Sequence, residues 1–131
     1  MRPNKMNNYG KAALLAVEIC TSKKISPVSA WRKATLLIFG NSAAQKRSAP
    51  KTVFLNLCQE GYIKNISPGD YTRSKTTSGY VTNAIDILST NKNQKFTPLE
   101  LWNKVQNKGL VNQYHMDVII TLWENNLIKL K

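Results

Sequence analysis

An internal repeat constrains the fold of this chain more than any other feature of its 131 residues. Self-similarity at a fixed spacing predicts copies of one supersecondary unit stacked around a shared core. Five identities recur 71 positions apart without a gap: Tyr9 and Tyr80, Ala13 and Ala84, Pro27 and Pro98, Trp31 and Trp102, Lys33 and Lys104. Four more recur 65 positions apart: Val53 and Val118, Leu57 and Leu122, Ile63 and Ile128, Lys64 and Lys129. Amphipathic helices share apolar spacing by convergence, but matched tryptophans and prolines favour duplication.

Each copy predicts three helices. Ser26-Pro27 and Thr97-Pro98 indicate the second helix of each copy, because a hydroxyl caps exposed N–H groups and proline suits the first helical position. Glu100 completes a capping box with Thr97. Trp31 and Trp102 fall on the inward faces as core anchors. The other helices are expected at residues 5–22 and 48–60 in the first copy, ended by Gly61, and at 78–89 and 112–124 in the second, ended by Asn125-Asn126.

The segment after Gly61 changes its pattern. Residues 62–66 and 71–73 flank Ser67-Pro68-Gly69-Asp70, which predicts two short strands around a turn. Three helices followed by such a hairpin are the element order of a winged helix, and the second copy is too short for a full wing. We therefore expect a mainly α fold, a tandem repeat of a helix-turn-helix or winged-helix-like unit. Its parts are a first unit at 5–73, a linker at 74–79 and a second unit at 80–131.

Composition predicts a globular protein without a redox or membrane role. Hydrophobic residues make up 42% and charged residues 20%, which supports a packed core. Cys20 and Cys58 lie in apolar helical contexts and are expected to be buried, reduced thiols. No apolar run approaches the length of a transmembrane helix, and the first residues lack the apolar centre of a signal peptide. We expect a cytoplasmic location.

The sequence offers little for catalysis. His115 is the only histidine, so no two-histidine metal site can form, and no CxxC pair or glycine-rich phosphate loop occurs. A Cys58–His115–Asn arrangement is disfavoured because Cys58 lies on the buried side of its helix. Carboxylates scattered over helices are typical of solvated surfaces. We expect a non-catalytic protein with no cofactor and no metal.

Net charge points to an anionic partner. The formal charge is +12, and residues 1–76 hold 13 Lys and Arg against 3 Asp and Glu, whereas residues 77–131 hold 6 against 4. Such asymmetry favours nucleic acid or an acidic protein surface, although a solvated basic face has the same composition. Nucleic acid, DNA over RNA, is the first hypothesis, and it gains weight from the expected helix-turn-helix.

The predicted contacts lie around the third helix and the wing. In this type of module flanking basic residues hold phosphates while the third helix meets base edges. Phosphate contacts are expected from Lys46, Arg47 and Lys51, and base contacts from Thr52 and Asn56, on a polar face shared with Gln59. The wing and linker add the remaining candidates, Lys64, Arg73 and Lys75, with Tyr71 as a stacking or sugar contact.

The equivalent face of the second copy is nearly neutral. Its residues Gln113, Tyr114, His115 and Thr121 predict contact with protein, with another copy of the chain, or with the first unit. The alternative function is therefore a protein-interaction module, such as a phage or bacterial inhibitor or adaptor that binds a larger nucleic-acid-processing complex. The sequence leaves the target site, the choice between DNA and RNA and the oligomeric state open.

The strings YGKAALLAVE, SPVSAW, FGNS, FLNLCQEGYIKNI and GDYTRS resemble an uncharacterised family of small bacterial proteins, a domain of unknown function. The resemblance covers most of the chain. It implies the duplication and an intracellular setting, and it implies no activity or site residues. The first unit also resembles winged-helix modules, in element order alone, which does not fix a function.

Overall fold

The computed structural model describes residues 7–106, 108–111 and 114–130, and this part of the chain is mainly helical, as predicted. None of its helices is long and apolar enough to cross a membrane. The helices are α1 (Asn8–Lys23), α2 (Pro27–Phe39), α3 (Ser48–Gln59), α4 (Lys75–Thr90), α5 (Pro98–Val105) and α6 (His115–Glu124).

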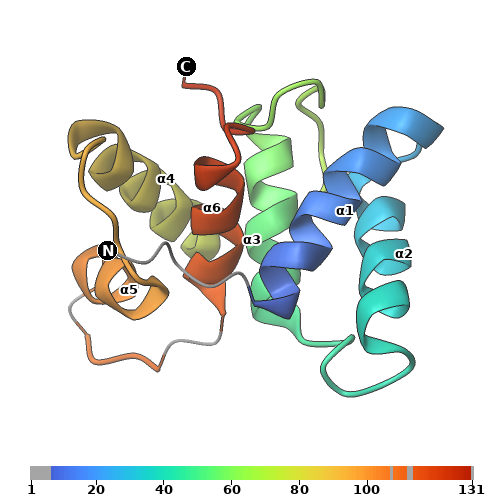
Figure 1. The fold of residues 1–131 in the computed structure, drawn as a ribbon, viewed down its shortest axis with the longest axis horizontal. Coiled ribbons are helices and arrows are strands. Elements are labelled where there is room, and N and C mark those ends of the chain that lie inside the picture. The colour runs from blue at the N-terminus through green and yellow to red at the C-terminus, as the bar shows by residue number, and fades with distance from the viewer. Residues whose placement is uncertain (1–6, 107, 112–113, 131) are drawn as a thin grey trace.

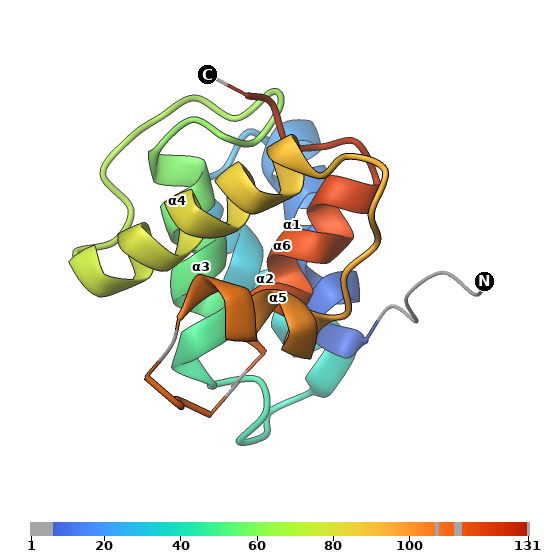
Figure 2. The ribbon, with the colours of Figure 1, turned by 90° about the vertical axis from the view of Figure 1, so that its left-hand side faces the viewer.

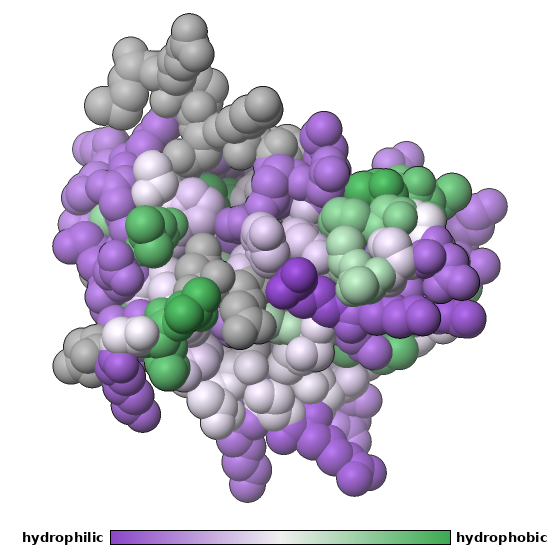
Figure 3. Space-filling view, turned by 90° about the horizontal axis from the view of Figure 1, so that it is seen from below, coloured by the Kyte–Doolittle hydropathy of each residue, from purple (hydrophilic) through white to green (hydrophobic). Residues whose placement is uncertain are grey.

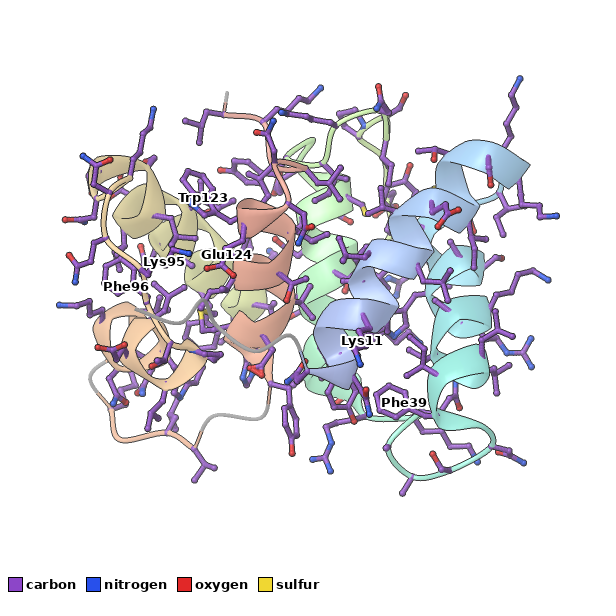
Figure 4. All side chains as sticks on the ribbon, viewed as in Figure 1. Lys11, Phe39, Lys95, Phe96, Trp123 and Glu124 are labelled. Carbon is purple, nitrogen blue, oxygen red and sulfur yellow. The ribbon has the colours of Figure 1, made fainter. Side chains whose placement is uncertain are left out.

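Helices α3 and α6 lie side by side at the centre of the molecule, with α1 and α2 on one side and α4 and α5 on the other (Figure 1, Figure 2). Both central helices are buried on every face over residues 53–58 and 116–122. Side chains from all six helices join one hydrophobic cluster. Phe96, before α5, is part of it and lies near Trp123 of α6 (Figure 4). The N-terminal half, α1–α3, and the C-terminal half, α4–α6, therefore share a core.

The second helix of each half begins where the sequence predicts. Ser26 Oγ accepts a hydrogen bond from the Ser29 amide (3.2 Å) at the start of α2. At the start of α5, Thr97 Oγ1 accepts from the Glu100 amide (3.1 Å), and Glu100 Oε1 accepts from the Thr97 amide (2.9 Å). The predicted capping box is confirmed. Each such cap stabilises a helix by about 1 kcal/mol.

The two central helices end in the same way. After α3 the Gly61 amide donates to Cys58 O (3.2 Å) and the Tyr62 amide to Leu57 O (3.0 Å), with Gly61 in the left-handed region at φ 79°. This is the Schellman pattern, which satisfies carbonyls at a helix C-terminus. The end of α6 repeats both bonds 65 positions later, and Asn126, at φ 59°, stands in place of the glycine. The predicted stops are thus confirmed.

The expected wing is wrong. Residues 62–74 are all described and contain no paired strands. Instead Ile63 forms an isolated antiparallel bridge with Ile128. The Lys64 amide donates to Leu127 O (2.9 Å), and the Lys129 amide donates to Tyr62 O (2.8 Å). The backbone after α3 is therefore paired with the segment after α6, and no hairpin partner is needed.

The chain then crosses α3 and leads directly into α4. Gln59 Oε1, on α3, accepts from the backbone amides of Tyr71 (2.8 Å) and Thr72 (2.9 Å), which fastens this segment. Ser74 Oγ caps α4 by accepting from the Thr77 amide (3.3 Å). The linker expected at 74–79 is consequently wrong, because Ser74 caps α4 and residues 75–79 are its first five residues.

Candidate nucleic-acid interface

A pocket of about 530 Å³ lies between α2 and the start of α3. One wall comes from α2, where side chains four residues apart share a face. The other comes from the α2–α3 loop and the first turn of α3. The eight lining residues are Val28, Trp31, Arg32, Leu36, Asn41, Gln45, Lys46 and Lys51. We call this the basic pocket.

Three cations and no acidic side chain occur among these eight described residues. Arg32, Lys46 and Lys51 are all exposed. Without a carboxylate between them, their positive potentials add within the pocket and favour an anionic ligand. The structure therefore brings together two of the predicted phosphate contacts, Lys46 and Lys51. It adds Arg32, which was not among the predicted contacts although it directly follows the core anchor Trp31.

Trp31 has an unusual environment for a core tryptophan. Only 2% of its surface is exposed, and its ring stacks on Phe54 with centroids 5.1 Å apart. Its Nε1 is buried and has no hydrogen-bond acceptor. The Nε1 of Trp102, 71 positions later in the sequence, donates to Leu110 O at 2.7 Å. Both tryptophans are core anchors, as predicted, but only the one that lines the basic pocket lacks an acceptor.

Arg47 faces a different group of residues. Its Nε donates to Tyr9 Oη (3.3 Å), and its guanidinium carbon lies 5.3 Å from the centre of the Tyr114 ring. The Tyr9 hydroxyl in turn donates to Ala44 O (2.8 Å) in the α2–α3 loop. Arg47 thus helps to hold this loop against α1 and the start of α6, and it is not among the residues that line the basic pocket.

The predicted base-reading residues are not placed for that role. Asn56 is fully buried, and its Nδ2 donates to Ser74 O (3.3 Å), so the expectation that it lies on an exposed polar face is wrong. Thr52 is half-buried, and its hydroxyl donates to Ser48 O (2.8 Å). The segment between Tyr71 and Ser74 covers this side of α3. Only the first turn of α3 remains accessible to a nucleic acid.

The remaining predicted cations are not gathered with the basic pocket. Lys64 Nζ donates to Asn126 Oδ1 (3.1 Å). Lys64 follows the C-terminal end of α3, whereas Lys51 lies in the first turn of that helix. A helix of 12 residues is about 18 Å long. Arg73 and Lys75 are exposed on either side of the α4 cap. None of these three lines the pocket.

The predicted protein-contact residues do not form one surface. Gln113 lies outside the described residues, and Tyr114 is exposed. His115 stacks on Trp102 with centroids 4.3 Å apart and an interplanar angle of 6°, and burial lowers the pKa of its imidazole. Thr121 is buried, so its expected contact with a partner is wrong.

Exposed apolar side chains do occur elsewhere. On α2, Leu36 and Leu37 are exposed, the latter over 73% of its surface. After α5, Leu110 and Val111 are exposed, the latter over 75%. Figure 3 shows apolar groups on two opposite sides of this end of the molecule, separated by hydrophilic side chains. Leu36 also lines the basic pocket, so apolar and basic surface meet there.

No curated protein and no solved structure matches this chain significantly. Residues 6–129 match a family described as "Family of unknown function (DUF6979)". The predicted likeness to an uncharacterised family is therefore confirmed, over nearly the whole chain. The chain belongs to the DUF6979 family.

Proposed function

We propose that this protein binds nucleic acid without catalysing a reaction, with double-stranded DNA as the first candidate. The observation that carries the proposal is the basic pocket, which Arg32, Lys46 and Lys51 line with no acidic residue among the described lining. Phosphate contacts supply most of the affinity of sequence-independent binding, and these cations are of the type that provides them.

The accessible residues favour contacts with phosphates over contacts with base edges. The middle of α3 is buried, and Asn56 is occupied by Ser74, so α3 is not free to lie along a groove. The cations sit on α2, on a loop and on the first turn of α3. We therefore infer binding that tolerates different sequences, with the duplex resting against this end of α2 and α3.

We also infer that the chain arose by duplication and that only the first copy carries this site. The antiparallel bridge joins Ile63 to Ile128, which are equivalent at the offset of 65, and its two hydrogen bonds are reciprocal. A pairing of equivalent residues is typical of a two-fold relation between copies. Arg32 and Lys51 correspond to Asn103 and Met116, which carry no charge. Divergence of the second copy would leave one basic site.

The test is a mobility shift on duplex DNA over a series of salt concentrations. For the wild type we expect retention that weakens steeply with salt, because bound phosphates release counterions. A variant with Arg32, Lys46 and Lys51 all replaced by Glu should lose retention. The matched control replaces three exposed lysines outside the pocket, Lys92, Lys108 and Lys129, by Glu, and has the same net charge.

Equal retention of the two variants would remove the basic pocket as the binding site. Single-stranded and RNA probes at the same salt concentrations identify the preferred nucleic acid. Arg47 is left unchanged, because its contacts with Tyr9 and Tyr114 give it a structural role.

A second candidate function is a protein-interaction module. The exposed side chains of Leu36 and Leu37 beside the basic pocket favour it, because apolar surface next to charge is typical of protein interfaces. Absence of a mobility shift even at low salt, together with a partner whose capture is lost on Leu37→Asp, would favour this function over nucleic-acid binding.

A further inference from the structure

We propose that the basic pocket seats a single phosphate group, held by Arg32, Lys46 and Lys51 and by the Trp31 indole N–H. The inference rests on the proposed function and deepens it, since it turns a basic surface into a discrete site. Its ligand is defined by chemistry, as an oxyanion with several acceptor oxygens. The group can come from a nucleic-acid strand or from free phosphate, and titrations with a duplex and with inorganic phosphate distinguish these two sources.

The unpartnered nitrogen of Trp31 is the observation that goes beyond charge. Trp31 lines the pocket, and its Nε1 is buried without an acceptor. A buried donor without a partner destabilises the folded protein, so native structures almost always supply one. An anion in the pocket would supply the missing acceptor.

Trp102 provides a comparison within the same chain. It corresponds to Trp31 in the repeat, and its Nε1 is satisfied by Leu110 O at 2.7 Å. Two tryptophans in equivalent helices thus differ in one respect. Trp102, which lines a pocket whose described lining has no Lys, Arg, Asp or Glu, has an internal acceptor, and Trp31, which lines the pocket with three cations, has none. This difference favours an external acceptor that is negatively charged.

The start of α3 adds to the attraction for an anion. No side chain caps this helix, so the N–H groups of its first turn lack a side-chain acceptor from the cap position. The N-terminus of a helix favours negative charge. Lys51 lies in that turn and lines the pocket. Of this turn only Lys51 lines the basic pocket, whereas Ser48 and Ala49 line a separate pocket with Trp102, so the helix end adds a longer-range attraction to that of the cations.

Access to Trp31 requires a side chain to move. The nitrogen is enclosed, whereas Arg32, Lys46 and Lys51 are long and exposed. Flexible basic side chains can shift at low cost and then close over the bound group. An arginine can also hold two oxygens of one phosphate at once.

The test follows the indole N–H signals of the full-length chain by two-dimensional ¹H–¹⁵N NMR. The chain has three tryptophans, and loss of one signal in Trp31→Phe assigns Trp31. Titration with inorganic phosphate should move the Trp31 signal saturably, and chloride at equal ionic strength should not. The Trp102 signal should stay in place, because its donor is already bonded.

Two variants test the cations. Arg32→Gln should weaken phosphate binding by about tenfold, the effect expected for loss of one charge-assisted hydrogen bond. Lys92→Gln removes one positive charge outside the pocket and should leave the affinity unchanged. Because the affinity is read from residues other than the one replaced, and the remaining spectrum reports folding, loss of structure is distinguished from loss of binding.

A parallel titration with a short duplex that contains only phosphodiesters separates the two sources. A Trp31 shift with duplex assigns the site to a nucleic-acid strand, and a shift with inorganic phosphate alone assigns it to free phosphate. Either result supports the pocket. Absence of a saturable Trp31 shift with both probes, or equal affinity of Arg32→Gln and wild type, overturns it. If the protein is retained on DNA but the Trp31 signal does not move with either probe, the phosphate site is overturned and the proposed function is kept. If the Trp31 signal moves with inorganic phosphate but the protein is not retained on DNA, the proposed function alone is overturned.

Discussion

Asp117 lies in the first turn of α6 with 7% of its surface exposed. Its Oδ2 accepts a hydrogen bond from Asn7 Nδ2 (2.6 Å), but its Oδ1 is buried without a partner. Burial raises the pKa of the Asp117 carboxyl above its usual value of 3.8, and the bond from Asn7 only partly offsets this. At neutral pH the ionised side chain therefore destabilises the folded state.

We predict that Asp117→Asn raises the free energy of unfolding at pH 7. The amide keeps an oxygen acceptor for Asn7 and carries no charge. Because the native carboxyl binds its proton more tightly than the unfolded one, the wild type loses stability as pH rises above 3.8. The advantage of the variant should thus shrink as pH falls toward 3.8. Urea denaturation at several pH values measures this, and a variant no more stable than wild type at pH 7 contradicts it.

The pKa of His115 moves in the other direction. Burial against Trp102 lowers it below its usual value of 6.5, so the native imidazole binds a proton less readily than the unfolded one. Stability from this residue is therefore complete above pH 6.5 and is lost as pH falls through the lowered pKa.

We predict that the melting temperature falls between pH 6.5 and pH 5 and that His115→Gln reduces this fall. Both proteins should also carry Asp117→Asn. The contribution of Asp117 to stability changes with pH in the opposite direction and would otherwise mask the effect of His115. Circular dichroism at each pH gives the melting temperature. An identical pH dependence with and without the imidazole would refute the assignment to His115.

At the scale of elements, α3 is held by the segment that crosses it. Gln59 supplies one acceptor oxygen for two backbone amides, those of Tyr71 and Thr72. We predict that Gln59→Ala lowers the free energy of unfolding by about 1–3 kcal/mol, the cost of leaving partly buried donors unpaired. Both amides should exchange with deuterium faster. Gln94→Ala in the exposed α4–α5 loop is the control, and unchanged exchange at Tyr71 and Thr72 would count against this role.

Local signals in the sequence were enough to predict the six helices, the starts of α2 and α5 and the ends of α3 and α6, whereas α4 begins three residues earlier than expected. Ser26, Thr97 and Gly61 act on neighbours within a few residues, so their effects can be read from short strings. The prediction of a wing was wrong because the partner of Ile63 is Ile128, which is far along the chain. The prediction that Asn56 is exposed was wrong for a similar reason. A polar residue in a helix suggests exposure, but a segment distant in the sequence covers Asn56.

The candidate site was predictable in part. Lys46 and Lys51 lie close together in the sequence, and their clustering needs only a loop that leads into a helix. Arg32 joins them through packing of α2 against α3, which no local pattern specifies. The unpartnered nitrogen of Trp31 depends on the whole surrounding structure and could not be anticipated.

At the scale of the whole molecule, the two halves share one core. Helix α1 packs on α6, and α3 packs on both α4 and α6, so each half covers apolar surface of the other. We predict that Ile128→Ala lowers the free energy of unfolding by about 2–5 kcal/mol, as expected for truncation of a buried isoleucine. The backbone amides of α1 and those of α4 should then both exchange with deuterium faster.

Hydrogen exchange across a urea series measures this coupling. Leu130→Ala is the control, because Leu130 is an exposed neighbour, and its effect should stay below about 0.5 kcal/mol. Separate unfolding transitions for α1–α2 and α4–α5 would show that the halves are independent, contrary to this prediction.

The bridge between Ile63 and Ile128 also bears on how the protein is made. Synthesis proceeds from the N-terminus, so α1 and α3 leave the ribosome long before α6 exists to cover them. The nascent first half thus exposes apolar side chains until α6 has been made. The Ile63–Ile128 bridge cannot close before residue 128 has been made, and a nascent chain arrested before α6 would be prone to aggregate.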